Sequence, residues 1–167
     1  MTSEHAQDRF EDRFQDRVDV LLVEDNAYDA ALALRAFRKE RPGTRLQVVR
    51  DGAEAVSFLL GDEPSGSEGQ RTRGLDPNQM PRLVLLDLNL PKLNGLEVLE
   101  RLRADARTKH LTIVVMTSSR EERDVTRAYA LGANSYVVKP LEYDKFAELV
   151  REIVGYWLDH NQAAVPR

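Results

Sequence analysis

Acidic side chains directly follow two short apolar runs in this sequence. The run LVLL (83–86) leads into Asp87, and the run VDVLLV (18–23) leads into Glu24 and Asp25. If these acids lay together they would repel one another, and one would be driven to bind a proton unless a cation neutralised them. Mg²⁺ suits a small group of carboxylates with retained waters. The acids therefore favour a magnesium site.

A hydroxyl and an amine follow two later apolar runs. Residues 111–116 lead into Thr117, and residues 135–138 lead into Lys139. With a metal ion neutralising the acids, Asp87 could act as an oxygen nucleophile. Lys139 would neutralise an anion on Asp87, and the Thr117 hydroxyl would donate a hydrogen bond to it. A phosphoryl group suits such a site, because its transfer depends mainly on positioning and charge neutralisation.

Strand and helix patterns alternate along the chain and would position these residues. The expected strands are 18–23, 46–49, 83–86, 111–116 and 135–138, and the expected helices are 27–38, 52–60, 95–104, 119–131 and 142–160. Continuous apolar strands joined by helices predict a parallel sheet covered on both faces, an α/β three-layer sandwich. Ligands of such sheets bind at the carboxyl ends of the strands, which is where these polar side chains would lie.

Two helix starts and one long loop can be predicted locally. Asn26 and Asp29 are spaced as a cap pair for the first helix, and Ser119 with Glu122 forms a capping-box pattern for the fourth. Residues 61–81 are rich in Gly, Pro and Ser without any period, which predicts a long exposed loop.

The chain divides into an arm, one domain and a tail. We expect a charged N-terminal arm over 1–17, a domain over 18–160 and a tail over 161–167. A four-residue quasi-repeat in the arm would align apolar side chains on one helical stripe, namely Phe10, Phe14 and Val18. The alternative is a frayed, charged tail.

Composition excludes several classes of protein. The net charge of −4 argues against nucleic acid or an anionic membrane as partner. The absence of cysteine excludes a disulfide scaffold and a thiolate metal site, and the histidines (His5, His110 and His160) are scattered. No apolar run approaches a membrane span, and the N-terminus lacks the core of a signal peptide, so we expect a cytoplasmic protein.

Four segments make the sequence similar to the receiver domains of two-component response regulators, of which CheY-like proteins are the single-domain form. They are VEDN (23–26), DLNLPKLNG (87–95), MTSS (116–119) and LGANSYVVKP (131–140). The resemblance covers about residues 18–158 and implies a flavodoxin-like fold with five strands in the order 2-1-3-4-5 and five helices.

The resemblance also implies roles for individual residues. Asp87 would be the phosphoacceptor and, with Asp25, a direct ligand of Mg²⁺. Glu24 would hold the metal ion through water, and the main-chain carbonyl of Asn89 would complete the protein ligands.

Further roles concern the phosphoryl group and the response to it. Thr117 and Lys139 would contact the phosphoryl group, and the bond from Lys139 to Pro140 would be cis. Thr117 and Tyr136 would be the switch residues, with Tyr136 turning inward as Thr117 reorients.

The implied function is that of a phosphorelay response regulator. A sensor histidine kinase would donate a phosphoryl group to Asp87, and the chain would catalyse only its own phosphorylation and a slow dephosphorylation. The long loop at 61–81 and the long last helix depart from the usual receiver. Together with the lack of an output module, the long loop resembles the single-domain regulators paired with phytochrome-type kinases, which include the bacteriophytochromes.

Output would then be a protein–protein contact, because one helix after the fifth strand leaves no room for a DNA-binding module. The last helix carries more apolar side chains than one sheet face needs. We expect a homodimer through this helix, with the interface residues Phe146, Val150, Trp157 and Leu158.

Three other functions compete with this interpretation. A phosphatase with an aspartate nucleophile would need a second acid two residues after Asp87, where Asn89 stands. A flavin or nucleotide module would need a phosphate-binding loop where Glu24 and Asp25 stand. A receiver-like scaffold or dimerisation module that never takes phosphate is the third alternative.

Overall fold

The computed structural model describes residues 17–61 and 74–163. The stripe of Phe10 and Phe14, most of the expected loop and the end of the tail lie outside these residues.

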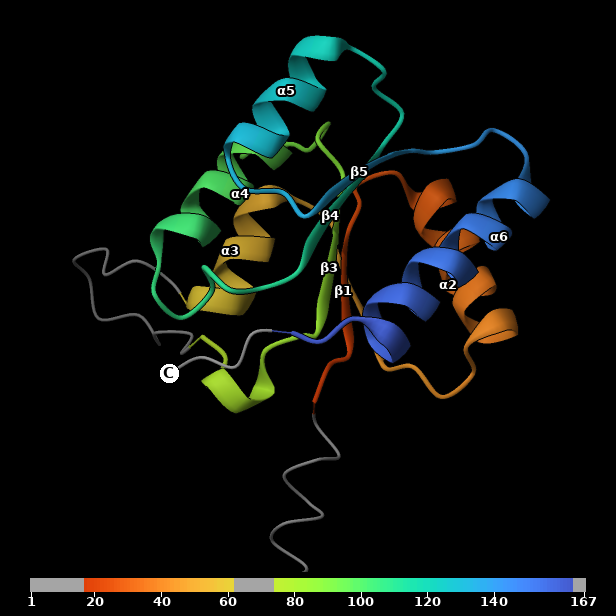
Figure 1. The fold of residues 1–167 in the computed structure, drawn as a ribbon, viewed down its shortest axis with the longest axis horizontal. Helices are drawn as coiled ribbons and strands as arrows, with labels where there is room; N and C mark the ends of the chain where they lie inside the picture. Colours follow the sequence, from red (N-terminus) through yellow and green to blue (C-terminus); the bar gives the residue numbers. More distant parts are fainter. Residues whose placement is uncertain (1–16, 62–73, 164–167) are drawn as a thin grey trace, which may run out of the picture.

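Five parallel strands form one sheet in the order β2-β1-β3-β4-β5 (Figure 1), which confirms the predicted order. The strands are β1 (Val20–Val23), β2 (Leu46–Val49), β3 (Leu83–Leu86), β4 (Ile113–Thr117) and β5 (Ser135–Val138). Every residue of β1, β3 and β4 is buried, as expected of strands covered on both faces. In the register, Val23 lies opposite both Val49 and Leu86, so these strands end level with one another.

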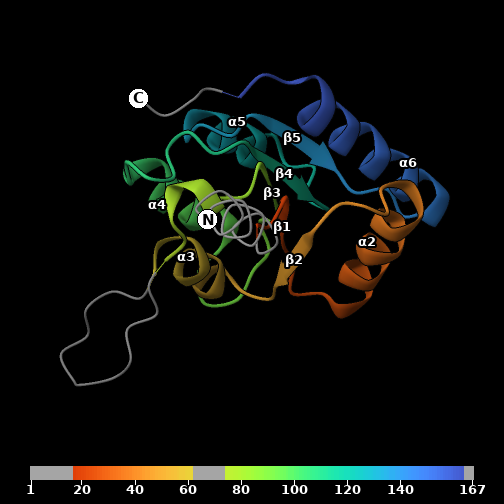
Figure 2. The same ribbon diagram turned by 90° about the horizontal axis from the view of Figure 1, so that it is seen from below.

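Helices cover both faces of the sheet and make the three layers that the sequence predicts (Figure 2). One face carries α2 (Ala27–Glu40) and α6 (Tyr143–Val154); the other carries α3 (Gly52–Leu60), α4 (Gly95–Ala104) and α5 (Glu122–Ala130). Each face has its own apolar core, one around Phe37 and Val150 and the other around Leu59 and Leu99. In the part of the chain that is described, every helix is too short or too polar to cross a membrane.

The two predicted helix starts have different outcomes. Asn26 caps α2 as predicted, since its side chain accepts hydrogen bonds from the amides of Tyr28 and Asp29. The capping box of Ser119 with Glu122 is wrong, because α5 begins only at Glu122. The Ser119 hydroxyl instead donates to Asp124, which lies inside the helix.

The end of the predicted loop is ordered against the core. Pro77–Gln79 form a short 3₁₀ helix, and Met80 after it is buried. The amide of Leu75 donates a hydrogen bond to the carbonyl of Leu59 at 3.2 Å. The chain therefore leaves α3 and returns to the same place on either side of residues 62–73.

The last helix reaches His160 as predicted, but its final part, Gly155–His160, is π-helical. The side chains of Phe146, Val150 and Leu158 are buried in this chain's own core. They are therefore not available to a second copy, which corrects the expected interface. Trp157 is half-buried against the same core.

Candidate functional site

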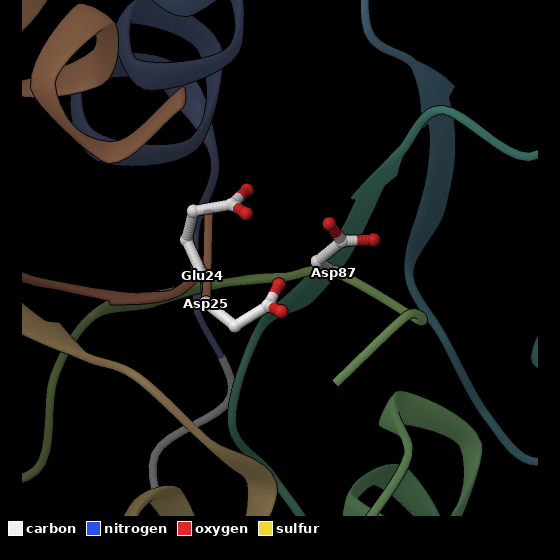
Figure 3. A group of neighbouring side chains, drawn as sticks. All are labelled: Glu24, Asp25 and Asp87. Carbon is white, nitrogen blue, oxygen red and sulfur yellow. The ribbon is translucent and has the colours of Figure 1, made fainter. Parts of the chain in front are cut away.

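Three carboxylates converge where β1 and β3 end side by side. Glu24 and Asp25 follow β1, and Asp87 follows β3 (Figure 3). One carboxylate oxygen from each lies within 4.8 Å of the others. Glu24 and Asp87 are buried, whereas Asp25 is exposed. The predicted acidic site thus forms, with one side open to solvent.

The Lys139 ammonium lies among these acids, carried there from the end of β5. Its Nζ donates to Asp87 Oδ2 at 2.8 Å and to Glu24 Oε2. It also donates to Asp29 Oδ2 at 3.1 Å, in the first turn of α2. Lys139 is itself buried, so the structure holds a buried cation against two buried carboxylates and one partly exposed carboxylate.

Burial and charge act against each other on these groups. Burial raises the pKa of the Glu24 carboxyl above its ordinary value, and the hydrogen bond from Lys139 offsets part of that rise. Burial alone would lower the pKa of Lys139, but the charge and hydrogen bond of Asp87, with those of Glu24, raise it overall. Lys139 is therefore a permanent cation at neutral pH.

The loop after Asp87 holds its carboxylate at the edge of the sheet. The Asn89 amide donates to Asp87 Oδ1 at 3.2 Å, and Leu88 beside it is buried. The chain then turns back so closely that a Cβ on Gly95 would lie 2.2 Å from the Asp87 carbonyl oxygen. Only glycine fits at this point, where α4 begins against the loop.

Thr117 ends β4 at the same edge and is fully buried. Its hydroxyl oxygen accepts a hydrogen bond from the Ser119 amide at 3.3 Å, and its carbonyl accepts one from the Lys139 amide at 2.8 Å. The backbone of β4 is therefore tied directly to the residue that carries the ammonium group.

Tyr136 on β5 links this edge to α5. Its hydroxyl donates to the Ser119 carbonyl at 3.1 Å, and its amide donates to the Tyr129 hydroxyl. Burial raises the pKa of the Tyr136 phenol, which therefore remains protonated and able to donate this bond. The loop after Thr117 is thus held by Tyr136, one of the two residues to which the family resemblance gives a switch role.

A cleft of about 550 Å³ begins at Leu88 and Asn89, which directly follow Asp87. It lies between the loops that follow β3 and β4, and its lining includes Asn89, Ser118 and Arg120. A small molecule that approaches this edge would meet these polar groups.

The described residues contain no cis peptide bond, so the bond from Lys139 to Pro140 is trans. The expected cis bond is therefore wrong for this structure. Trans is the ordinarily favoured form of a peptide bond to proline, by about 0.5–1 kcal/mol.

Comparison with known proteins decides the family. The family model of the response regulator receiver domain matches residues 20–151. The chain belongs to this family. The flavodoxin-like fold of CheY-like receivers, inferred from the four sequence segments, is confirmed by the strand order and by solved neighbours.

Two named proteins are similar to this chain over most of their length. The probable methanogenesis regulatory protein FilR2 of Methanothrix harundinacea is 38% identical over 88% of this chain and 88% of its own. The response regulator Rcp1 of Synechocystis is 33% identical over 84% of this chain and 88% of its own. A Mn²⁺-bound structure of Rcp1 covers 87% of this chain and 98% of its own with a TM-score of 0.72.

The phosphorylated cyanobacterial phytochrome response regulator RcpA is a third similar protein. It is 30% identical, with a TM-score of 0.74, over 89% of this chain and 99% of its own. Phytochrome response regulators are thus among the relatives of this receiver domain.

One residue of this site was not predicted from the sequence. Asp29 was assigned only to the cap of α2, yet its carboxylate contacts Lys139, which is 110 positions away. The signal available was its place in the first turn after Glu24 and Asp25, which puts it at the same edge of the sheet.

Proposed function

We propose that this receiver domain is switched by a phosphoryl group on Asp87. The observation that carries the proposal is the Lys139 ammonium bonded at once to Asp87 and Glu24, beside Asp25, at the carboxyl edge of the sheet. A buried cation of this kind can neutralise an anion attached to Asp87.

The carboxylates fit a divalent cation, since one oxygen from each lies within 4.8 Å of the others and oxygen is the ligand that Mg²⁺ prefers. Asp25 and Asp87 would hold Mg²⁺ directly, with Glu24 acting through water and Asn89 through its carbonyl. When bound, the ion would neutralise charge on the transferring group. The Mn²⁺-bound form of Rcp1 supports a divalent ion in this family.

In the proposed step, one Asp87 carboxylate oxygen bonds to the phosphorus of a donor. The bond from phosphorus to the donor breaks, and its electron pair leaves with the donor. Lys139 and the Thr117 hydroxyl would hold the oxygens of the new acyl phosphate. Thr117 would turn from its bond with Ser119, and Tyr136, bonded to the Ser119 carbonyl, would respond to that movement.

Intact mass tests this function directly. The protein is incubated with acetyl phosphate and Mg²⁺, as wild type and as Asp87→Asn. We expect one phosphoryl group on the wild type, none on Asp87→Asn, and none on either in excess chelator. Asp105→Asn is the matched control, because Asp105 pairs with Arg107 in the loop after α4 and should leave phosphorylation unchanged.

No mass addition to a folded wild-type protein would contradict the proposal. It would favour the scaffold that never takes phosphate. We also propose that the chain catalyses only its own phosphorylation and dephosphorylation. Turnover of a phosphate ester would contradict this.

We propose a histidine kinase of the phytochrome class as donor, and a contact with another protein as output. Similarity to RcpA and to other phytochrome response regulators supports this choice of donor. Transfer from a phosphorylated phytochrome kinase should be faster than transfer from an unrelated histidine kinase. Equal rates with both would contradict this assignment.

We also propose a homodimer through the end of the last helix. Tyr156 is 54% exposed, and its ring stands edge-on to Trp157 at 5.0 Å, so two aromatic side chains are offered there. Light scattering of Tyr156→Ala should give a smaller mass than the wild type. A wild-type monomer would contradict the dimer.

A further inference from the structure

The ammonium group of Lys139 has no hydrogen-bond donor to spare. A lysine ammonium carries three N–H donors. In this structure the three face three carboxylates, on Asp87, Glu24 and Asp29. Phosphorylation turns the Asp87 carboxylate into an acyl phosphate, so the hydrogen bond from Lys139 to Asp87 can pass to one phosphoryl oxygen. Lys139 can bind a second phosphoryl oxygen only by giving up Glu24 or Asp29.

The three partners differ in what their release would cost. The side chain of Glu24 is 2% exposed and that of Asp87 is 7% exposed, whereas that of Asp29 is 32% exposed. A buried carboxylate that loses its cation pays a large desolvation penalty, whereas water can solvate an exposed one. Asp29 is therefore the partner that Lys139 can release at least cost.

The surroundings of Asp29 suit a carboxylate that is released and recaptured. Its amide donates to the capping side chain of Asn26 at 3.1 Å, which holds this residue in the first turn of α2. A negative charge is favoured at a helix N-terminus with or without a partner. The three acids that converge for a metal ion do not include Asp29.

We propose that Asp29 is a positioning residue that occupies Lys139 in the unphosphorylated receiver and yields it to the incoming phosphoryl group. This inference rests on the proposed function of Asp87. Asp29 holds the ammonium at the site before phosphorylation and competes with the phosphoryl group for it. The first turn of α2 is consequently released from Lys139 when the phosphoryl group arrives.

Beryllium fluoride with Mg²⁺, a mimic of the phosphoryl group on a carboxylate, measures this competition by isothermal titration calorimetry. Asp29→Asn keeps the size of the side chain and removes its charge. We expect Asp29→Asn to bind the mimic about three- to fivefold more tightly than the wild type, the size of a partly exposed ion pair. Asp29→Ala should show at least the same gain.

Asp144→Asn is the matched control. Asp144 is also in the first turn of a helix, α6, and is exposed, and the contacts of Lys139 do not include it. It should leave the affinity for the mimic unchanged. A second readout is the amide signals of Tyr28 and Asp29, which should shift with the mimic in the wild type and much less in Asp29→Asn.

The outcomes separate this inference from the function on which it rests. Equal or weaker binding by Asp29→Asn, or an equal gain in Asp144→Asn, would overturn the role of Asp29 and leave phosphorylation of Asp87 standing. Failure of the folded wild type to bind the mimic, together with no mass addition from acetyl phosphate, would overturn both.

Discussion

The two edges of the sheet use charged and polar residues in opposite ways. At the carboxyl edge, where strands end, Glu24, Asp87 and Lys139 are all buried. At the amino edge, where strands begin, the ion pair of Arg45 with Asp19 is partly exposed. The guanidinium of Arg82, at the same edge, donates a hydrogen bond to the main-chain carbonyl of Leu158.

The difference separates groups that stabilise the fold from groups kept for chemistry. Asn134, just before β5, accepts hydrogen bonds from the Ile113 amide and from Arg103. Its own amide donates to the Ile113 carbonyl, so it provides hydrogen-bond partners for the backbone at the start of β4. Burying a cation with two anions is a poor way to gain stability, because well-packed apolar residues often do as well or better. The carboxyl edge therefore carries a cost that its proposed use in phosphoryl binding would explain.

The largest expected effect comes from removing the buried cation. Lys139→Met leaves Glu24 and Asp87 facing each other with no positive charge between them. In chelator we expect the free energy of unfolding to fall by about 3–5 kcal/mol, the usual cost of breaking a buried ion pair. Urea unfolding measures the loss, and Mg²⁺ should restore part of it by neutralising the same acids.

Arg41→Met is the matched control for this change. Arg41 makes two 2.6 Å hydrogen bonds to Asp159, but both side chains are partly exposed. We expect its stability to stay near that of the wild type, since exposed pairs contribute little. An equal loss in both variants would abolish the distinction between the two edges.

A smaller effect is expected from paired glycine substitutions. A Cβ on Gly95 would meet the backbone of Asp87 and Leu88, whereas a Cβ on Gly155 has open space around it. Gly95→Ala should cost about 1–3 kcal/mol through overpacking and also weaken phosphorylation. Gly155→Ala should be neutral or gain up to about 1 kcal/mol, as alanine replaces glycine in a helix. Thermal unfolding with the intact-mass assay distinguishes these results.

The smallest effect should come from an exposed pair at the carboxyl edge. Lys92 donates to Asp51 at 2.6 Å, and this hydrogen bond lowers the pKa of Asp51 below its ordinary 3.8. The pair therefore stabilises the fold above about pH 4, and that stabilisation is lost as pH falls through the lowered pKa. Lys92→Met should be slightly less stable than the wild type at pH 7 and equal to it at low pH.

A pH series of urea midpoints measures this difference. If Lys92→Met lowered the free energy of unfolding as much as Lys139→Met, the contribution of an ion pair would depend on its place at this edge of the sheet and not on its burial.

Much of this site could be predicted because its residues sit beside strong local signals. Asp87 follows a fully apolar strand and precedes a proline and a glycine, so its place at the sheet edge follows from its neighbours. Thr117 and Lys139 end strands in the same manner. The bounds of β2, β3, β5, α3 and α4 agree with the sequence prediction because a clear apolar period or a glycine start marks each of them.

The remaining features depend on contacts that local patterns do not encode. The Ser119 hydroxyl donates to Asp124, five positions further on, because α5 begins at Glu122 and Ser119 stands too far before it to cap it. Leu158, in the π-helical end of the last helix, is buried with residues of α2 and the sheet, whereas the sequence analysis placed it in a dimer interface. The contact of Asp29 with Lys139 spans strands that are not neighbours in the sheet, so only the folded chain brings them together.

The hydrogen bond between Leu75 and Leu59 has a consequence for how this chain can change in length. It fastens the two sides of segment 62–73 to each other, close to the end of α3. For flexible loops in general, each doubling of the length between two joined ends costs only about 0.6 kcal/mol of chain entropy. We therefore expect that residues can be added or lost between Gly61 and Gly74 over evolutionary time, or a reporter protein inserted by design, with little change in the free energy of unfolding.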